Sequence, residues 1–219
     1  MKSTFQSHSK ILILLSFALN ASQARAQITV ENLFISWVNV ITQVAPDRVP
    51  AASFTTDATF PSYELSTIVL SMHSGVGQPG GFSLKLYSDA SNQPGLPLET
   101  LVGSSHPFSA GKYTYTSNGT VLAANTTYWI VAEASVGDAQ ANYYSWRMVS
   151  DTAQTTTGSS NWLIGDGWAE RPYQSQSWGL SPSFTFQFAV TAIPEPSTYG
   201  MLALGLGMIV WLRRRRAKA

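Results

Sequence analysis

The chain of 219 residues contains no cysteine. This absence excludes a disulfide framework, a thiol nucleophile and a cysteine-ligated zinc site. The metalloprotease pattern H-E-x-x-H is absent as well, and no other stretch has metal-ligand spacing. A secreted domain of this length can be stable without disulfides because its core is large enough. We therefore expect no resident metal and no cofactor.

Charged residues are scarce, at 11% of the chain, and they are unevenly placed. Between Gln27 and Ile193 there are five basic and eleven acidic residues, a net charge of −6. The net charge of the whole chain is +1 only because basic residues gather at the two ends. An acidic domain without a basic stripe argues against nucleic-acid binding.

The last 26 residues combine a proline-rich triplet, a short apolar run and a basic cluster. In chain order these are Pro194-Glu195-Pro196, Tyr199–Leu212 and Arg213-Arg214-Arg215-Arg216. As a helix, the apolar run spans about 21 Å, against about 30 Å of bilayer hydrocarbon, so it predicts a single short transmembrane helix. The arginines indicate that the C-terminus is cytoplasmic. The prolines should interrupt regular structure, so the triplet is predicted to be an extended, accessible spacer.

This order of features resembles the PEP-CTERM sorting signal of Gram-negative bacteria. The resemblance implies processing by exosortase, a membrane-embedded cysteine transpeptidase-like enzyme. The protein would be anchored transiently in the inner membrane and then reach the cell surface or the extracellular matrix. The resemblance also suggests a link to exopolysaccharide and biofilm. The alternative is an ordinary single-pass C-terminal anchor, and both interpretations place the preceding domain outside the cytoplasm.

The N-terminus has the pattern of a secretory signal peptide. Lys2 and Lys10 supply positive charge, Ile11–Leu19 is an apolar core, and Ala24-Arg25-Ala26 is a small-x-small cleavage site. Cleavage after Ala26 would leave Gln27 as the first mature residue. The predicted organisation is a signal peptide over 1–26, an extracellular domain over 27–193 and a sorting segment over 194–219.

The mature region has the two-residue periodicity of β-strands and no convincing helical period. Ser183–Val190 alternates strictly, with phenylalanines on one face, and Thr127–Ser135 places Tyr128, Ile130 and Ala132 on one face. Turn residues separate the expected strands, with turns at Pro94–Gly95, a hairpin-type turn at Ser117–Thr120 and a loop over Asp151–Ser160. The pattern predicts an all-β fold, an antiparallel β-sandwich or jelly roll.

Part of this domain resembles the choice-of-anchor R type of bacterial extracellular domain. The similar stretches are Leu65–Leu70, Phe82–Asp89, Gln93–Gly95 and Leu122–Trp129. The resemblance implies a β-domain that is used with interchangeable C-terminal anchors. Its motifs are strand and turn patterns, so it carries no catalytic residues over to this chain.

Three tryptophans and two acids in the aromatic region over Asn161–Ser181 suggest ligand chemistry. Trp162, Trp168 and Trp178 could form a sugar-stacking platform, although most tryptophans in a sandwich fill its core. Asp166 and Glu170 could be the paired carboxylates of a glycoside hydrolase, or simply parts of an acidic loop.

Two further candidates lie outside that region. His73 and His106 adjoin turn residues, which favours solvated loop histidines over a catalytic base, and no G-x-S-x-G nucleophile motif is present. The stretch from Asp89 to Gly95 is rich in oxygen ligands and could bind Ca²⁺, but Asx side chains that close a turn explain it equally well.

The preferred interpretation is an exported, non-catalytic domain that acts by binding or structure and folds alone as a monomer. The first alternative is a carbohydrate-binding module that presents the tryptophan-rich loops to exopolysaccharide. The second is a polysaccharide-acting hydrolase that uses Asp166, Glu170 or a histidine.

Overall fold

The computed structural model describes residues 27–34, 40–150, 153–158, 161–165, 168–172, 177–182 and 184–195, with 205, 207–209, 211, 214 and 215 in the tail. The predicted signal peptide up to Ala26, Asp166, Pro196, Tyr199, Leu212, Arg213 and Arg216 lie outside the described residues. The domain over 27–195 is therefore seen almost whole.

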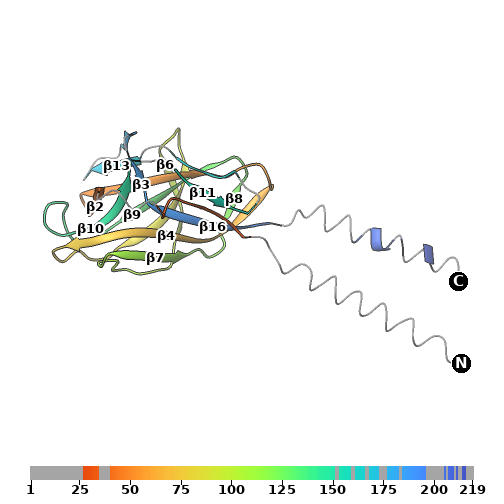
Figure 1. Cartoon of the computed structure of the whole chain (residues 1–219), viewed down its shortest axis with the longest axis horizontal. Helices are drawn as coiled ribbons and strands as arrows, with labels where there is room; N and C mark the ends of the chain where they lie inside the picture. The colour runs from red at the N-terminus through yellow and green to blue at the C-terminus, as the bar shows by residue number, and fades with distance from the viewer. Residues whose placement is uncertain are drawn as a thin grey trace, which may run out of the picture.

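The described residues form sixteen strands in two antiparallel sheets (Figure 1). Sheet A contains β1 (Ile28–Glu31), β2 (Val40–Val44), β4 (Ser62–Val76), β7 (Gly111–Thr116), β8 (Val121–Ala123), β10 (Tyr143–Val149), β11 (Thr155–Thr157), β15 (Thr185–Phe186) and β16 (Phe188–Pro194). Sheet B contains β3 (Arg48–Thr55), β5 (Ser83–Asp89), β6 (Pro94–Thr100), β9 (Thr127–Glu133), β12 (Leu163–Ile164), β13 (Trp168–Pro172) and β14 (Gly179–Ser181). The all-β, antiparallel prediction is confirmed.

Strand order places the long β4 at the centre of sheet A and β9 inside sheet B. The main path of sheet A is β11-β1-β16-β4-β10-β15, with β2 on β10 and both β7 and β8 on β4. The main path of sheet B is β14-β13-β3-β9-β5-β6, with β12 on β3. Both sheets contribute apolar side chains to one large buried cluster, so they pack face to face in a sandwich-like fold.

Aromatic residues dominate the space between the sheets. Trp146 of β10 stacks on Phe186 of β15 at 4.1 Å between ring centroids, and Phe54 of β3 stacks on Trp162 at 5.8 Å. All four side chains are fully buried. Burying one large apolar side chain contributes about 1.5–3 kcal/mol, so this layer is the main source of stability and explains why no disulfide is needed.

The alternating stretch over Ser183–Val190 places its aromatic face in the core as predicted, but it does not form one strand. Phe186 and Phe188 are fully buried, yet β15 pairs with β10 while β16 pairs with β4. Gln187 lies at the change of partner, where its N–H donates to the carbonyl of Arg147 and its own carbonyl accepts from the indole of Trp146. The prediction of a continuous half-buried strand was therefore wrong, because the chain moves from one partner strand to another.

Three turn predictions also need correction. The segment Ser117–Thr120 is no hairpin, because β7 and β8 pair in succession with the same edge of β4 and not with each other. The carboxylate of Glu99 accepts hydrogen bonds from this segment and so holds it away from the ladder. Pro94–Gly95 begins β6 instead of preceding it, and the expected loop over Asp151–Ser160 contains β11, which pairs with β1.

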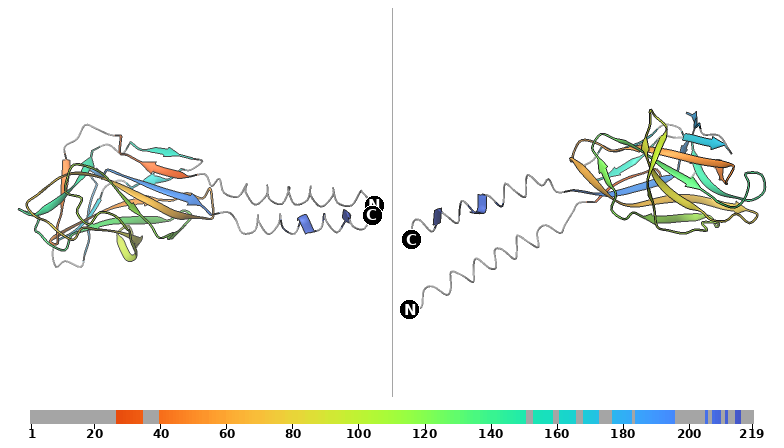
Figure 2. Two further views of the ribbon diagram at one scale, coloured as in Figure 1. Left: turned by 90° about the horizontal axis from the view of Figure 1, so that it is seen from below. Right: turned by 180° about the vertical axis from the view of Figure 1, so that it is seen from behind.

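The first and last strands of the domain are neighbours. Ile28 of β1 pairs with Ala192 of β16, so the domain begins and ends at the same end of sheet A (Figure 2). The strand β16 continues to Pro194, one residue beyond the expected boundary at Ile193, and lies between β1 and β4. The last strand therefore completes the middle of sheet A through contacts that are distant in sequence.

Candidate functional site

The outer face of sheet B carries a second, smaller cluster of buried side chains. Alternation in β9 places Tyr128 and Ile130 in the main core, and therefore Trp129 and Val131 on the opposite face. The members of this cluster are Val49, Ala51, Tyr87, Trp129, Val131 and Ala169, with the partly buried Trp178 packed against them. An outer face with its own aromatic cluster is not a plain solvated surface.

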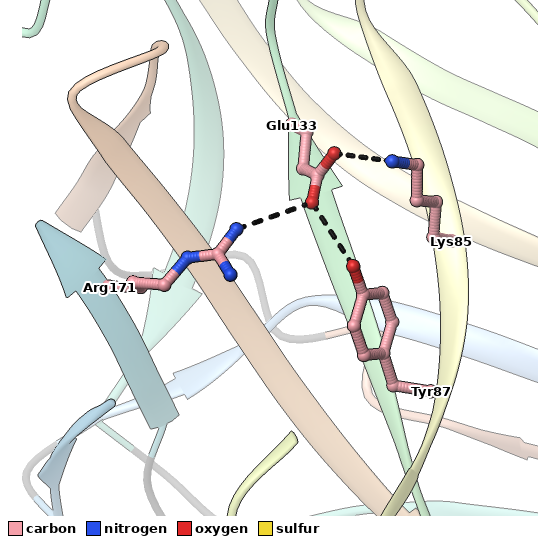
Figure 3. Close-up of polar contacts among 4 residues, drawn as sticks. All are labelled: Lys85, Tyr87, Glu133 and Arg171. Atoms are coloured by element: carbon pink, nitrogen blue, oxygen red, sulfur yellow. Dashed lines mark hydrogen bonds and ion pairs between the residues drawn. The ribbon is translucent and has the colours of Figure 1, made fainter. Parts of the chain in front are cut away.

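A carboxylate surrounded by two cations and a phenol borders this cluster (Figure 3). Glu133 pairs with Lys85, whose Nζ lies 2.6 Å from Oε2, and with Arg171, whose Nη2 lies 3.6 Å from Oε1. The hydroxyl of Tyr87 donates to Oε1 at 3.3 Å. Burial and the adjacent negative charge of Glu133 raise the pKa of Tyr87 above its ordinary value. The carboxylate is therefore fully engaged by its neighbours.

Two further cation contacts cover the same side of sheet B. The guanidinium of Arg171 lies 5.0 Å from the ring centroid of Trp178, and the Nε of Arg48 lies 3.0 Å from Oε1 of Glu170. Of the five basic residues between 27 and 193, three therefore pair with acids of sheet B. These contacts order the rim of the outer face and hold Trp178 in place.

A cleft of about 500 Å³ opens beside this cluster. Its walls come from four strands of sheet B and from the loops next to them, and they combine indole rings with hydroxyl and amide groups. The lining residues are Ser53, Thr55, Asn92, Thr127, Trp129, Gly165, Trp168, Leu180, Ser181 and Pro182. A cleft with aromatic surfaces and a few fixed polar groups is typical of a small-ligand site.

Hydrogen bonds hold the walls of this cleft in place. Asp89 accepts from the indole N–H of Trp129 at 2.8 Å and from the backbone N–H of Asn92 at 3.1 Å, so one carboxylate orients two lining residues. The hydroxyls of Thr55 and Thr127 share a hydrogen bond at 2.9 Å. The cleft is therefore preformed, which lowers the entropic cost of binding.

Two positions in the cleft show features that the sequence did not reveal. A Cβ on Gly165 would lie 1.9 Å from the hydroxyl oxygen of Ser53, so a larger residue at this position would require the Ser53 side chain to move. The buried indole N–H of Trp168 has no hydrogen-bond partner in the described part of the chain. A buried donor without a partner costs free energy.

The three tryptophans proposed as a sugar platform lie in three different environments. Trp162 is fully buried between Phe54 and Tyr63 in the main core, so its assignment to a binding platform was wrong. Trp168 lines the cleft and also contacts Phe186 edge to face at 5.9 Å. Trp178 is partly exposed beside Arg171 but is not among the lining residues.

Glu170, His73 and His106, the described residues considered for catalysis, each interact with residues outside this set. Glu170 is engaged by Arg48, and Asp166 lies outside the described residues, so their separation stays untested. His73 lies within β4 and not in a loop as expected, whereas His106 is exposed, stacks on Phe108 and shares a hydrogen bond with Tyr144 at 2.9 Å. No three His, Asp or Glu side chains are grouped as metal ligands within the part of the chain described.

The possible calcium loop has a simpler role. Asp89 closes the turn by accepting from Asn92, and Ser91 and Asn92 both have the positive φ angles of a tight turn. Together with the bond to Trp129, both carboxylate oxygens of Asp89 already have protein donors. The turn-closing interpretation is confirmed.

Sequence reasoning missed Trp129, which is the most deeply placed aromatic residue of the cleft. The signal was present, because the alternation that places Tyr128 and Ile130 inside must place Trp129 outside on the other face of β9. The turn residue Asn92 belongs to the stretch from Asp89 to Gly95, for which the sequence indicated a calcium loop or an Asx turn and not a place in a cleft.

The sorting segment begins inside the folded domain. Pro194 is buried and pairs with Tyr63 at the end of β16, and the backbone N–H of Glu195 donates to the carbonyl of Ser62 at 3.1 Å. The prediction of an accessible spacer was therefore wrong for these two residues. Proline fits here because it stands at the end of the ladder, where its missing N–H is not needed.

Comparison with known proteins identifies this segment. Residues 192–216 match the family model described as the PEP-CTERM protein-sorting motif. The match implies export, transit in a membrane-anchored form and processing by exosortase. No curated protein and no solved structure matches the chain. The resemblance of the β-domain to the choice-of-anchor R type therefore stays a prediction.

In the tail, the described residues 205, 207–209, 211, 214 and 215 are helical, and the guanidinium of Arg215 lies 4.2 Å from the ring centroid of Trp211. Within the described residues, no helix has the length and hydropathy needed to span a membrane.

Proposed function

We propose that this protein is an exported, non-catalytic glycan-binding domain, released to the cell surface or the extracellular matrix after its sorting tail is processed. The single observation that carries the proposal is the cleft of about 500 Å³ on the outer face of sheet B, walled by Trp129, Trp168 and hydroxyl side chains. Its size lies within the usual range of about 300–1,000 Å³ for small-ligand sites.

The chemistry of the lining suits a sugar. Carbohydrates present both apolar ring faces and many hydroxyl groups. The indole rings supply the apolar part of the wall, with Trp129 only 4% exposed, and the side chains of Ser53, Thr127 and Asn92 can donate and accept hydrogen bonds. These groups recognise neutral hydroxyls, and no charged side chain is among the lining residues described.

The proposal favours binding without hydrolysis. Glycoside hydrolases use two carboxylates about 5–9.5 Å apart across the scissile bond. The described lining contains no Asp, Glu or His, and the carboxylate of Glu170 is engaged by Arg48. A sorting tail that implies export agrees with a role in exopolysaccharide or biofilm, where a preformed sugar cleft is useful.

A glycan array followed by affinity measurements tests this proposal. The parent domain should bind neutral polysaccharide, and Trp168→Ala should weaken that binding at least tenfold, because tryptophan truncations at binding hot spots cost about 2 kcal/mol or more. Leu180→Ala should weaken it by a smaller factor, and since Leu180 is 51% exposed this change leaves the fold intact. The matched control is Lys112→Ala on sheet A.

Thermal melts of each variant separate loss of binding from loss of folding. Parental affinity in both cleft variants, or no glycan bound by the parent, would contradict the proposal. Loss of sugar turnover on changing Glu170, in a parent that cleaves polysaccharide, would favour the hydrolase instead.

A further inference from the structure

The sorting motif and the last strand of the domain share residues. The motif begins at residue 192, whereas β16 ends at Pro194. Residues 192–194 therefore belong both to the signal and to the centre of sheet A. Ala192 is fully buried and Pro194 is buried, so the fold covers part of what a processing enzyme must recognise.

One residue of β4 engages both the backbone and the side chain of Glu195. The hydroxyl of Ser62 donates to Oε2 of Glu195 at 2.6 Å, and the carbonyl of Ser62 accepts from its N–H at 3.1 Å. The first bond is charge-assisted, and such bonds are shorter and stronger than neutral ones. We call this pair of contacts the Ser62 clasp.

The clasp rests on a rigid support. Ser62 pairs on its other side with Ala123 of β8, and the preceding part of β16 is held on both edges, by β1 and by β4. The N–H of Glu195 and its carboxylate are thus engaged as long as the end of β16 stays paired. An enzyme that binds an extended peptide needs those groups free for its own contacts.

The short stretch of chain after Glu195 places the Ser62 clasp close to the membrane. Three residues lie between Glu195 and Tyr199, where the apolar run begins, so four Cα–Cα steps join the two. Four steps of a fully extended chain reach at most about 14 Å. While the clasp is closed, the folded domain must therefore lie next to the start of the apolar run, where it competes for space with a membrane-embedded enzyme.

We propose that the Ser62 clasp withholds Pro194 and Glu195 from the processing enzyme, so that release of the end of β16 from β4 precedes cleavage. Ser62 is a positioning residue that acts through Glu195. The domain thereby controls its own sorting, because the rate of processing depends on how often Pro194 and Glu195 detach from β4. This inference does not depend on the glycan-binding proposal.

A pulse-chase experiment on the full chain, in cells that contain the processing enzyme, tests the clasp. Ser62→Ala removes the charge-assisted bond but leaves the backbone bond and the motif unchanged. A buried hydrogen bond to a charged group changes an equilibrium constant by more than about tenfold, and a partly exposed bond changes it by less. We therefore expect Ser62→Ala to be processed about threefold to tenfold faster than the parent. Ser62→Thr keeps a hydroxyl and should restore the parental rate.

Two controls separate the clasp from general stability. Ser71→Ala changes another partly exposed serine of β4, and Tyr115→Phe removes the hydrogen bond to the carbonyl of Ser104 from β7, a strand that does not pair with β16. Both should be processed at the parental rate, and protease resistance should show that the domain of every precursor is folded. An unchanged or slower rate in Ser62→Ala, or an equal acceleration in Tyr115→Phe, would overturn the inference.

Discussion

The outer faces of the two sheets differ in chemistry although both are antiparallel and both cover the same core. On sheet A, the outward positions of β4 and its neighbours include Thr67, Val69, Thr114 and Thr116. On sheet B, the corresponding surface has Tyr87, Trp129 and Trp178 with paired charges around them. Small β-branched residues suit a wet sheet face, whereas a buried aromatic cluster beside a cleft is unusual on the outer face of a sheet.

The two sheets also differ in what they contain. Sheet A contains the first and last strands, and Ser62 at the beginning of β4 binds Glu195 of the sorting motif. Sheet B contains the preformed cleft. If both proposals hold, the sorting motif and the ligand lie on different sheets, so ligand binding does not depend on the pairing of β16.

The largest expected effect concerns the second cluster. Trp129 is only 4% exposed, so Trp129→Ala should lower the free energy of unfolding by about 3–5 kcal/mol, the usual cost of removing a buried tryptophan. The matched change on the outer face of sheet A, Val69→Ala, should cost less than about 1 kcal/mol. Urea unfolding measures both values, and equal costs would mean that the two outer faces are energetically alike.

The fold class could be predicted because it depends on a local, repeated signal. The alternation in β9 and the buried phenylalanines around Gln187 follow directly from the two-residue period. Strand partners could not be predicted, because pairing joins residues far apart in sequence. Thus the apparent hairpin at Ser117–Thr120 runs along β4 instead, and one predicted strand is divided between two partners at Gln187.

The candidate site was predicted only in part for the same reason. A tryptophan-rich segment predicts that some aromatic rings are exposed, but composition alone does not determine which ring faces the core. Trp162 is inside, whereas Trp168 lines the cleft. The clasp could not be anticipated either, since Ser62 and Glu195 are 133 residues apart and proline at 194 suggested the end of regular structure.

A second prediction concerns the charges that border the cluster on sheet B. Glu133→Gln should lower the free energy of unfolding by about 1 kcal/mol at low salt, because it removes the shared partner of Lys85 and Arg171. The loss should shrink as salt increases, since partly exposed ion pairs are screened. Glu31→Gln on β1 of sheet A is the comparison, and an equal loss there would remove the contrast between the faces.

A smaller effect links the two sheets through pH. Burial tends to raise the pKa of Glu99, but hydrogen bonds from the N–H of Asn118 and the hydroxyls of Ser117 and Thr120 outweigh it and lower that pKa below its ordinary value of 4.5. Stability from this group is therefore fully present above pH 4.5 and is lost as the pH falls through the lowered pKa.

Glu99→Gln should accordingly lower the free energy of unfolding near neutral pH. The difference in free energy of unfolding between the variant and the parent should become smaller as the solution is acidified. Chemical unfolding between pH 3 and pH 7, set on either side of the ordinary carboxyl pKa, measures this difference. A difference that is constant across the range would show that the carboxylate does not tie β6 to the β7–β8 segment through its charge.

The most direct test of the account is to observe which tryptophans respond to a bound glycan. The indole N–H resonances of the ¹⁵N-labelled domain report this individually, and Trp146 is an internal control because it lies in the core with its N–H bonded to the carbonyl of Gln187 at 3.0 Å. On titration with neutral polysaccharide, the resonances of Trp129 and Trp168 should shift while that of Trp146 stays fixed. Shifts confined to backbone amides of sheet A, with the indoles of Trp129 and Trp168 unmoved, would contradict the claim that sheet B is the binding face.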